Sequence, residues 1–82
     1  MPLNYICSVK LSTVNDCKEL YKIACNSPVE MYLVSGYTRI PASSLMCIFS
    51  LDLSKSVEVY IEDLHYKECI TESIKYFVVK ED

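Results

Sequence analysis

Residues 34–59 read VSGYTRIPASSLMCIFSLDLSKSVEV, and this stretch decides the interpretation of the fold. Gly36 is the only glycine of the chain and lies between two short segments rich in β-branched and aromatic residues. A glycine in that position is typical of a tight turn between strands. We therefore expect strands over residues 29–35 and 37–40 that pair as a hairpin.

The rest of the stretch predicts a short helix followed by a strand. Residues 41–44, Pro-Ala-Ser-Ser, have the composition of a helix start. Residues 45–51 are almost entirely apolar, and a helix this short is stable only when packing holds it. After a loop at 52–56, residues 57–62 alternate between apolar side chains and acidic or aromatic ones. This period of two predicts a strand that buries one face.

Toward the N-terminus, residues 4–10 are rich in strand-forming side chains and predict another strand. Thr13 and Asp16 have the spacing of a capping box, with aspartate in place of the usual glutamate. Pro28 marks the end of the helix that they begin, because proline disfavours helical geometry in the residue before it. The expected buried face of this helix consists of Val14, Cys17, Leu20, Tyr21, Ala24 and Cys25.

Toward the C-terminus, residues 63–68 are polar and predict a connection. A last amphipathic helix carries Ile70, Ile74, Phe77 and Val78, before a polar tail at 80–82. The order β-α-β-β-α-β-α does not alternate strictly, which favours an α+β fold with a four-stranded antiparallel sheet and three helices on one face. We expect residues 1–82 to form a single domain.

Composition argues against several classes of function. Charged residues make up 23% of the chain and the net charge is −3, so the sequence has no basic surface for nucleic acid. No apolar run approaches the roughly 20 residues of a membrane-spanning helix, and the scattered lysines do not favour an anionic membrane. Residues 1–4 lack the features of a secretory signal, so we expect a cytoplasmic protein.

Cysteine usage is consistent with that location. The cysteines are an odd number and form no Cys-x-x-Cys pair; they are Cys7, Cys17, Cys25, Cys47 and Cys69. Each lies in an expected helix or strand among apolar neighbours, which predicts buried or half-buried free thiols. A zinc site is the alternative, but one histidine and no paired ligands give it little support. We expect no metal and no cofactor.

Residues 34–59 resemble the middle of HPr, the histidine-containing phosphocarrier of the sugar phosphotransferase system. In that family a hairpin leads into a Lys-Ser-Leu/Ile/Met helix start, and a short apolar helix ends in a Leu-Gly-Leu turn before a valine-rich strand. Residues 20–24 fall on the first helix of the family, and Ile70 and Ile74 fall on the last. The resemblance covers roughly residues 4–79 and implies the HPr-like open-faced sandwich.

The chain departs from the family where HPr carries Gly-Leu-His-x-Arg-Pro-Ala. Here residues 11–17 read LSTVNDC, without histidine, arginine or proline. Phosphoryl transfer at that place needs an imidazole nucleophile, with an arginine and free helix N–H groups to hold the anion. Asp16 instead places a carboxylate where phosphate should sit, so we expect no carrier chemistry. The residues of this degenerate active-site region are Thr13, Val14, Asn15 and Asp16.

A second departure lies in the loop before the last predicted strand. Asp52 and Ser56 stand where the family has glycines. Aspartate tolerates left-handed backbone better than most residues, which favours preservation of the turn.

The second helix holds the candidate regulatory and binding residues. Ser44 aligns with the serine that a dedicated kinase phosphorylates in HPr of low-GC Gram-positive bacteria; alternatively, Ser43 or Ser44 only caps the helix. Because one face of the helix packs on the sheet, some of Leu45, Met46 and Phe49 must face outward. The resemblance implies that HPr docks partners through the corresponding apolar patch. The alternative is that a neighbouring loop covers all three side chains.

Two further features have competing interpretations. His65, the only histidine, is expected in a solvated loop at the end opposite the start of the first helix; a displaced phosphate acceptor is the alternative. The tyrosines are ordinary half-buried side chains or an aromatic stripe on the open sheet face that supports a dimer. They are Tyr5, Tyr21, Tyr32, Tyr37, Tyr60, Tyr66 and Tyr76.

The leading hypothesis is a noncatalytic HPr-like protein, monomeric or weakly dimeric. Its expected partner is a component or regulator of the phosphotransferase system, bound through residues 44–49. One alternative is an active phosphocarrier with an atypical acceptor. The other is a structural module that dimerises through the tyrosine-bearing sheet face.

Overall fold

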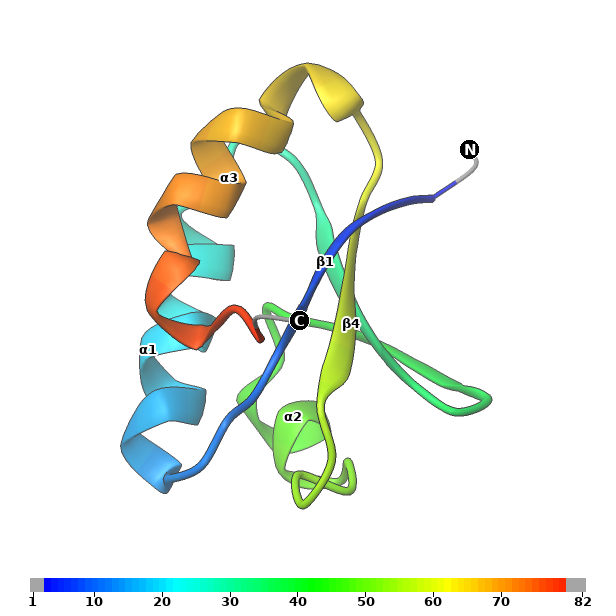
Figure 1. The fold of residues 1–82 in the computed structure, drawn as a ribbon, viewed down its shortest axis with the longest axis vertical. Helices are drawn as coiled ribbons and strands as arrows, with labels where there is room; N and C mark the ends of the chain where they lie inside the picture. The colour runs from blue at the N-terminus through cyan, green and yellow to red at the C-terminus, as the bar shows by residue number, and fades with distance from the viewer. Residues whose placement is uncertain (1–2, 80–82) are drawn as a thin grey trace.

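A computed structural model describes residues 3–79 as a four-stranded sheet packed against helices (Figure 1). The sheet is antiparallel and three α-helices accompany it, as the α+β prediction requires. The predicted polar tail at 80–82 lies outside the described residues. In chain order the elements are β1 (Asn4–Val9), α1 (Val14–Cys25), β2 (Met31–Ser35), β3 (Thr38–Pro41), α2 (Leu45–Phe49), β4 (Val57–Ile61), η1 (Leu64–Tyr66), α3 (Lys67–Ser73) and η2 (Lys75–Phe77).

β4 is a central strand of the sheet and packs against the helix layer. The strand order is β1-β4-β2-β3, so β4 is hydrogen-bonded on both sides. Val57, Val59 and Ile61 are fully buried, whereas Glu58 between them is exposed. Since side chains alternate across a strand, β4 supplies one apolar face and one polar face. The predicted alternation is confirmed.

The predicted hairpin is present, and Gly36 makes it possible. Ser35 pairs with Thr38, so Gly36 and Tyr37 form a two-residue turn between β2 and β3. Gly36 has φ of 61°, and among residues 3–79 no other residue has positive φ. A positive φ at the first turn position followed by a negative φ at the second is the type II′ pattern, whose twist suits a hairpin.

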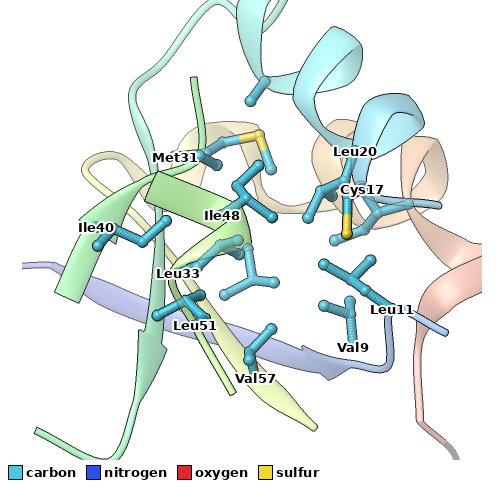
Figure 2. Close-up of a cluster of buried hydrophobic side chains, with 14 of the residues drawn as sticks. Val9, Leu11, Cys17, Leu20, Met31, Leu33, Ile40, Ile48, Leu51 and Val57 are labelled. Atoms are coloured by element: carbon cyan, nitrogen blue, oxygen red, sulfur yellow. The ribbon is translucent and has the colours of Figure 1, made fainter. Parts of the chain in front are cut away.

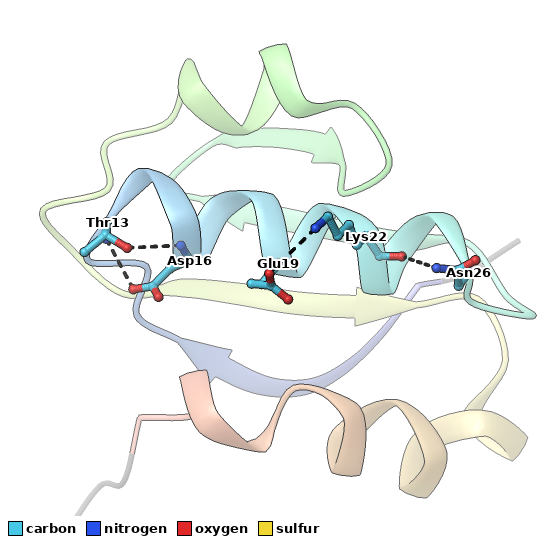
Figure 3. Close-up of polar contacts among 5 residues, drawn as sticks. All are labelled: Thr13, Asp16, Glu19, Lys22 and Asn26. Atoms are coloured by element: carbon cyan, nitrogen blue, oxygen red, sulfur yellow. Dashed lines mark hydrogen bonds and ion pairs between the residues drawn. The ribbon is translucent and has the colours of Figure 1, made fainter.

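The helices lie on one side of the sheet, with α1 between α2 and α3 (Figure 3). The hydrophobic core fills the space between this layer and the strands (Figure 2). Its largest fully buried side chains are Leu20, Met31, Leu33, Ile48, Ile61, Ile70, Ile74, Val9, Val57, Val59 and Cys17.

α2 depends on packing because it has only five residues. Ile48 is its one buried side chain and is fully enclosed in the core. The helix ends at Phe49, two residues before the predicted end, because the N–H groups of Ser50 and Leu51 donate to carbonyls three residues back. Leu51 remains buried beyond this tight turn.

We predict that Ile48→Ala lowers the free energy of unfolding by about 2–4 kcal/mol, because it opens a cavity beneath α2. Met46→Ala, in the same helix but at an exposed position, is the control and changes stability by less than about 0.5 kcal/mol. Urea unfolding of the two variants measures the difference. Equal effects contradict the assignment of Ile48 as the anchor of α2.

The predicted last helix is wrong at its C-terminal end. α3 stops at Ser73, and Phe77 and Val78 lie beyond it in η2 and an extended segment. Val78 forms an antiparallel bridge with Val9, flanked by hydrogen bonds from Lys10 N to Phe77 O (2.8 Å) and from Val79 N to Ser8 O (2.9 Å). β1 is an edge strand whose backbone groups need partners. Extended backbone at 78–79 supplies these partners, whereas a helix has none to offer.

The predicted connection at 63–68 is also wrong, because helical structure begins inside it. The Asp63 carboxylate accepts a hydrogen bond from His65 N at 2.9 Å, which starts η1, and α3 follows directly from Lys67. A side-chain cap of this kind turns a polar segment into a helix start. Between α1 and β2, Val29 lies outside the strand that was predicted to begin there, and the Ser27 hydroxyl donates to its C=O and accepts from its N–H.

The thiols differ in exposure more than the sequence predicts. Cys17 is buried and Cys7 and Cys47 are half-buried, but Cys25 and Cys69 are exposed, in contrast to the prediction. The Cys25 thiol lies at the end of α1 with its Sγ 3.9 Å from Ser43 O, and Cys69 lines an open pocket between α1 and α3. Burial raises the pKa of the Cys7 and Cys17 thiols, and the Asp16 carboxylate raises the Cys17 pKa further. Residues 3–79 contain no cluster of three metal-ligating side chains.

We predict that Ellman's reagent modifies Cys25 and Cys69 in a fast phase in the native protein. Cys17 reacts only after unfolding, because its side chain is inaccessible and its raised pKa disfavours the thiolate. Mass spectrometry of the modified residues checks the order, and Cys25→Ser combined with Cys69→Ser removes the fast phase. Fast modification of Cys17 contradicts the packing of α1 described above.

Candidate functional site

The first part of the candidate site is the end of the sheet where β1 stops and β4 starts. Val9 pairs with Val57, so the segments that follow β1 and precede β4 are neighbours. The N-terminus of α1 lies at this end of the molecule (Figure 1). A pocket of about 540 Å³ opens here, and its lining includes Lys10, Ser12, Asp16 and Ser56.

The predicted capping box at the start of α1 is confirmed. Asp16 N donates to Thr13 Oγ1 at 3.1 Å, and Thr13 N donates to Asp16 Oδ2 at 3.2 Å (Figure 3). Thr13 has the extended backbone of an N-cap, with φ −132° and ψ 164°. Ser12 N also donates to Asp16 Oδ2, at 3.0 Å. The Asp16 carboxylate therefore accepts from two backbone N–H groups, and the Thr13 hydroxyl accepts from a third.

This arrangement disfavours the binding of an anion at the start of α1. A phosphate bound at a helix N-terminus relies on free N–H groups and positive charge. Here the Asp16 carboxylate accepts the N–H groups of Ser12 and Thr13, just before the first residue of α1, and its negative charge would repel a phosphate placed beside the helix start. Among residues 3–79, Lys10 is the lysine that lines the pocket, and it donates its Nζ to Leu53 O at 2.8 Å.

His65 does not reach this end of the molecule. It lies in η1 after β4, and the register pairs Ile61 at the end of β4 with Asn4 at the start of β1. The side chain is exposed, and its ring contacts Tyr66 edge-on at 5.3 Å between centroids. His65 is thus at the end opposite the start of α1, as predicted, and cannot act as a displaced acceptor there.

We predict that Thr13→Ala lowers the free energy of unfolding by about 1 kcal/mol, because Asp16 N loses its acceptor at the start of α1. Ser12→Ala is the matched control: it removes a neighbouring exposed hydroxyl that is not the N-cap acceptor. Thermal and urea unfolding give the comparison. Identical stability of the two variants contradicts the capping role of Thr13.

The second part of the site is an exposed apolar surface beside the capped end. Val14 is 61% exposed, Met46 80% and Phe49 41%. Val14 and Phe49 line the same pocket of about 460 Å³ between α1 and α2, and Leu53 lies at its wall. Met46 and Phe49 are three residues apart and share one side of α2. We call Val14, Met46 and Phe49 the α1–α2 patch.

The three residues that the sequence predicts for binding differ in their exposure to solvent. Met46 and Phe49 are exposed, but Leu45 is half-buried and packs against the core. Val14 was expected on the buried face of α1 and instead faces solvent. It is the first residue of the helix, where no strand lies opposite. Its position at the helix start is the sequence signal that could have placed it on the surface.

The loop between α2 and β4 lies beside this site, and none of its residues has left-handed backbone geometry. Asp52 has negative φ, as do the other non-glycine residues in 3–79, so the expectation drawn from its tolerance of left-handed geometry is wrong. Its Oδ1 instead accepts hydrogen bonds from Ser54 N at 3.1 Å and from Ser54 Oγ at 2.5 Å. These bonds lower the pKa of the carboxyl group and hold the turn.

Ser44 occupies the N-cap position of α2, but its hydroxyl makes no capping hydrogen bond. The interpretation of Ser44 as a side-chain cap is therefore wrong. The residue is half-buried, and its N–H donates to Pro41 O at 3.2 Å. Phosphorylation of Ser44 stays a prediction.

Comparison of the chain with protein-family models, with curated proteins and with solved structures gives no significant match. None of the helices described in residues 3–79 has the length and hydrophobicity needed to cross a membrane.

Proposed function

We propose that this chain is a noncatalytic HPr-like protein that binds a protein partner through the α1–α2 patch. One observation carries the proposal: exposed apolar side chains lie beside a helix end that the chain's own carboxylate has closed. Val14, Met46 and Phe49 provide the surface, and Asp16 provides the closure. The partner class that the HPr resemblance implies is a component or regulator of the sugar phosphotransferase system.

The physical reason for binding is the removal of apolar surface from water. Covering such side chains releases about 25 cal/mol per Å² of apolar area. Met46 is the most exposed of the three, and methionine adapts its shape to irregular partner surfaces. Lys10 and Asp16, beside the patch, already bond to Leu53 O and to backbone N–H groups, so the patch itself is apolar.

Loss of the carrier reaction follows from the same geometry. Thr13 Oγ1 accepts the Asp16 N–H, and Asp16 Oδ2 accepts the N–H groups of Ser12 and Thr13, so the two side chains form a helix cap and not a nucleophile paired with a base. Without a base, a threonine hydroxyl is a weak nucleophile. The site thus keeps a docking surface and lacks an acceptor.

We predict that the chain gains no acid-labile phosphate when it is incubated with phosphoenolpyruvate and the phosphoenolpyruvate-dependent enzyme of the phosphotransferase system. An authentic HPr in the same reaction is the positive control. Intact-mass spectrometry before and after mild acid detects the modification. Stoichiometric acid-labile phosphate on this chain establishes the alternative, a phosphocarrier with an atypical acceptor.

We also predict that the same enzyme, without phosphoenolpyruvate, perturbs the amide resonances of Val14, Met46 and Phe49 in a titration of the labelled protein. Met46→Asp weakens this binding at least tenfold, because it places a charge in the apolar contact. Leu64→Asp makes the same chemical change at an exposed leucine in η1, at the other end of the molecule, and leaves binding unchanged. Equal loss in both variants, or perturbation confined to η1 and α3, contradicts the proposed surface.

A further inference from the structure

The face of the sheet that the helices leave uncovered carries an ordered row of tyrosines. Tyr5 pairs with Tyr60, and Tyr60 pairs with Tyr32, so the three side chains lie side by side across β1, β4 and β2. The rings of Tyr5 and Tyr60 make an edge-on contact at 5.7 Å between centroids. One of the two tyrosine interpretations from the sequence, an aromatic stripe on the open face, matches this arrangement.

Two carboxylates flank the middle of the row. Glu58 and Tyr60 alternate with buried residues of β4 and therefore share the uncovered face, and Glu62, the first residue after the strand, reaches Tyr32 on the same face. The Tyr32 hydroxyl donates to Glu62 Oε1 at 3.2 Å. The pKa of Tyr32 is raised by burial and by the Glu62 and Glu30 carboxylates, and Arg39 partly opposes this rise.

The row already holds one guanidinium group. Arg39 on β3 places its Cζ 5.8 Å from the centre of the Tyr32 ring, within the range of a cation–π contact. Arg39 is opposite Val34 in the register, diagonal to Tyr32. Its contact shows on this molecule one kind of group that suits the face, a flat cation over a tyrosine ring. Tyr60 is the next tyrosine of the row, and Glu58 precedes it on the same face of β4.

We propose that this tyrosine row, Tyr5, Tyr60 and Tyr32 with Glu58 and Glu62, binds an extended peptide segment that carries arginine at alternate positions. Charge complementarity and spacing support this occupant. Side chains that share a strand face repeat every two residues, about 6.6–6.8 Å, in both β4 and an extended peptide. Alternate arginines therefore fall over Glu58 and Tyr60, pairing with the carboxylate and stacking on the ring, and the next arginine lies toward Glu62 at the end of β4.

Two other occupants fit the face less well. Bases of a single-stranded nucleic acid stack on aromatic rings, but its phosphates would lie against Glu58 and Glu62. A second copy of the chain brings one arginine to the face, Arg39, which already lies over Tyr32. Lysine-bearing peptides satisfy the charge but not the planar stacking and bidentate pairing of arginine.

The test uses the whole chain and the synthetic peptide acetyl-Gly-Arg-Thr-Arg-Thr-Arg-Gly-amide, in which β-branched threonine favours extended backbone. Calorimetry and amide shifts are recorded at low ionic strength, about 50 mM NaCl, where surface charge pairs are weakly screened. We expect saturable binding that shifts the amides of β4 and β2. The lysine version of the peptide binds at least about threefold more weakly.

Variants separate this site from general attraction to an acidic protein. Glu58→Gln with Glu62→Gln weakens binding about tenfold, and Tyr60→Val weakens it about threefold while keeping a strand-forming side chain. Glu19→Gln with Glu68→Gln removes the same charge from exposed helix positions and leaves affinity unchanged. Met46→Asp also leaves it unchanged, so failure of the α1–α2 patch and failure of the tyrosine row are distinguishable.

Three results overturn the proposal. The first is that the arginine peptide shows no saturable binding up to about 1 mM, so that it behaves like the lysine peptide and like a mixture with an unrelated folded protein. The second is equal weakening by the face variants and the Glu19 and Glu68 variants, which indicates diffuse charge attraction. The third is a change of the β4 amides with protein concentration in the absence of peptide, which assigns the face to a second copy of the chain.

Discussion

The reciprocal hydrogen bonds between Thr13 and Asp16 decide what the exposed end of α1 can do. Every helix begins with backbone N–H groups that lack partners within the helix, and these groups bind either an external anion or a nearby side chain. In this chain Asp16 takes the N–H groups of Ser12 and Thr13. The start of the helix is thereby stabilised by the chain's own side chains, and a carboxylate lies at the end where an external anion would otherwise be favoured.

A second constraint is that the side chains of β4 point alternately to the two faces of the sheet. This alternation places the α1–α2 patch and the tyrosine row on opposite sides of the molecule. Val59 and Ile61 point into the core beneath the helices, whereas Glu58 and Tyr60 point to the uncovered side. The α1–α2 patch therefore belongs to the helix layer and the tyrosine row to the opposite face of the sheet. Since side chains on opposite faces of a strand do not touch, the surfaces can be altered independently.

Features that depend on neighbours in sequence were predictable. The turn at Gly36 needs only a positive φ, the capping box needs only the spacing of Thr13 and Asp16, and the alternation of residues 57–61 is local. The apolar stripe of α1 also gave the buried positions of its middle turns. That some of Leu45, Met46 and Phe49 face outward followed from a simple limit, because a short helix can bury only one side; which of them do so required the structure.

Features that depend on distant backbone groups were not predictable. Phe77 and Val78 have helical periodicity, but the free edge of β1 draws them into extended structure. Val14 and Cys25 fit the apolar stripe of α1, yet they sit at its two ends, beyond the reach of the core. The joining of Val14 to Met46 and Phe49 into one patch also required knowledge of how α1 packs against α2.

The most direct measurement of the central claim is a titration of the labelled protein with inorganic phosphate, followed by the amide resonances of Ser12, Thr13 and Asp16. If the carboxylate closes the helix end, these resonances move only with ionic strength, and sodium chloride reproduces the change. A saturable, phosphate-specific shift of these three amides in the wild-type chain contradicts the account, because it shows an anion displacing Asp16 from its donors.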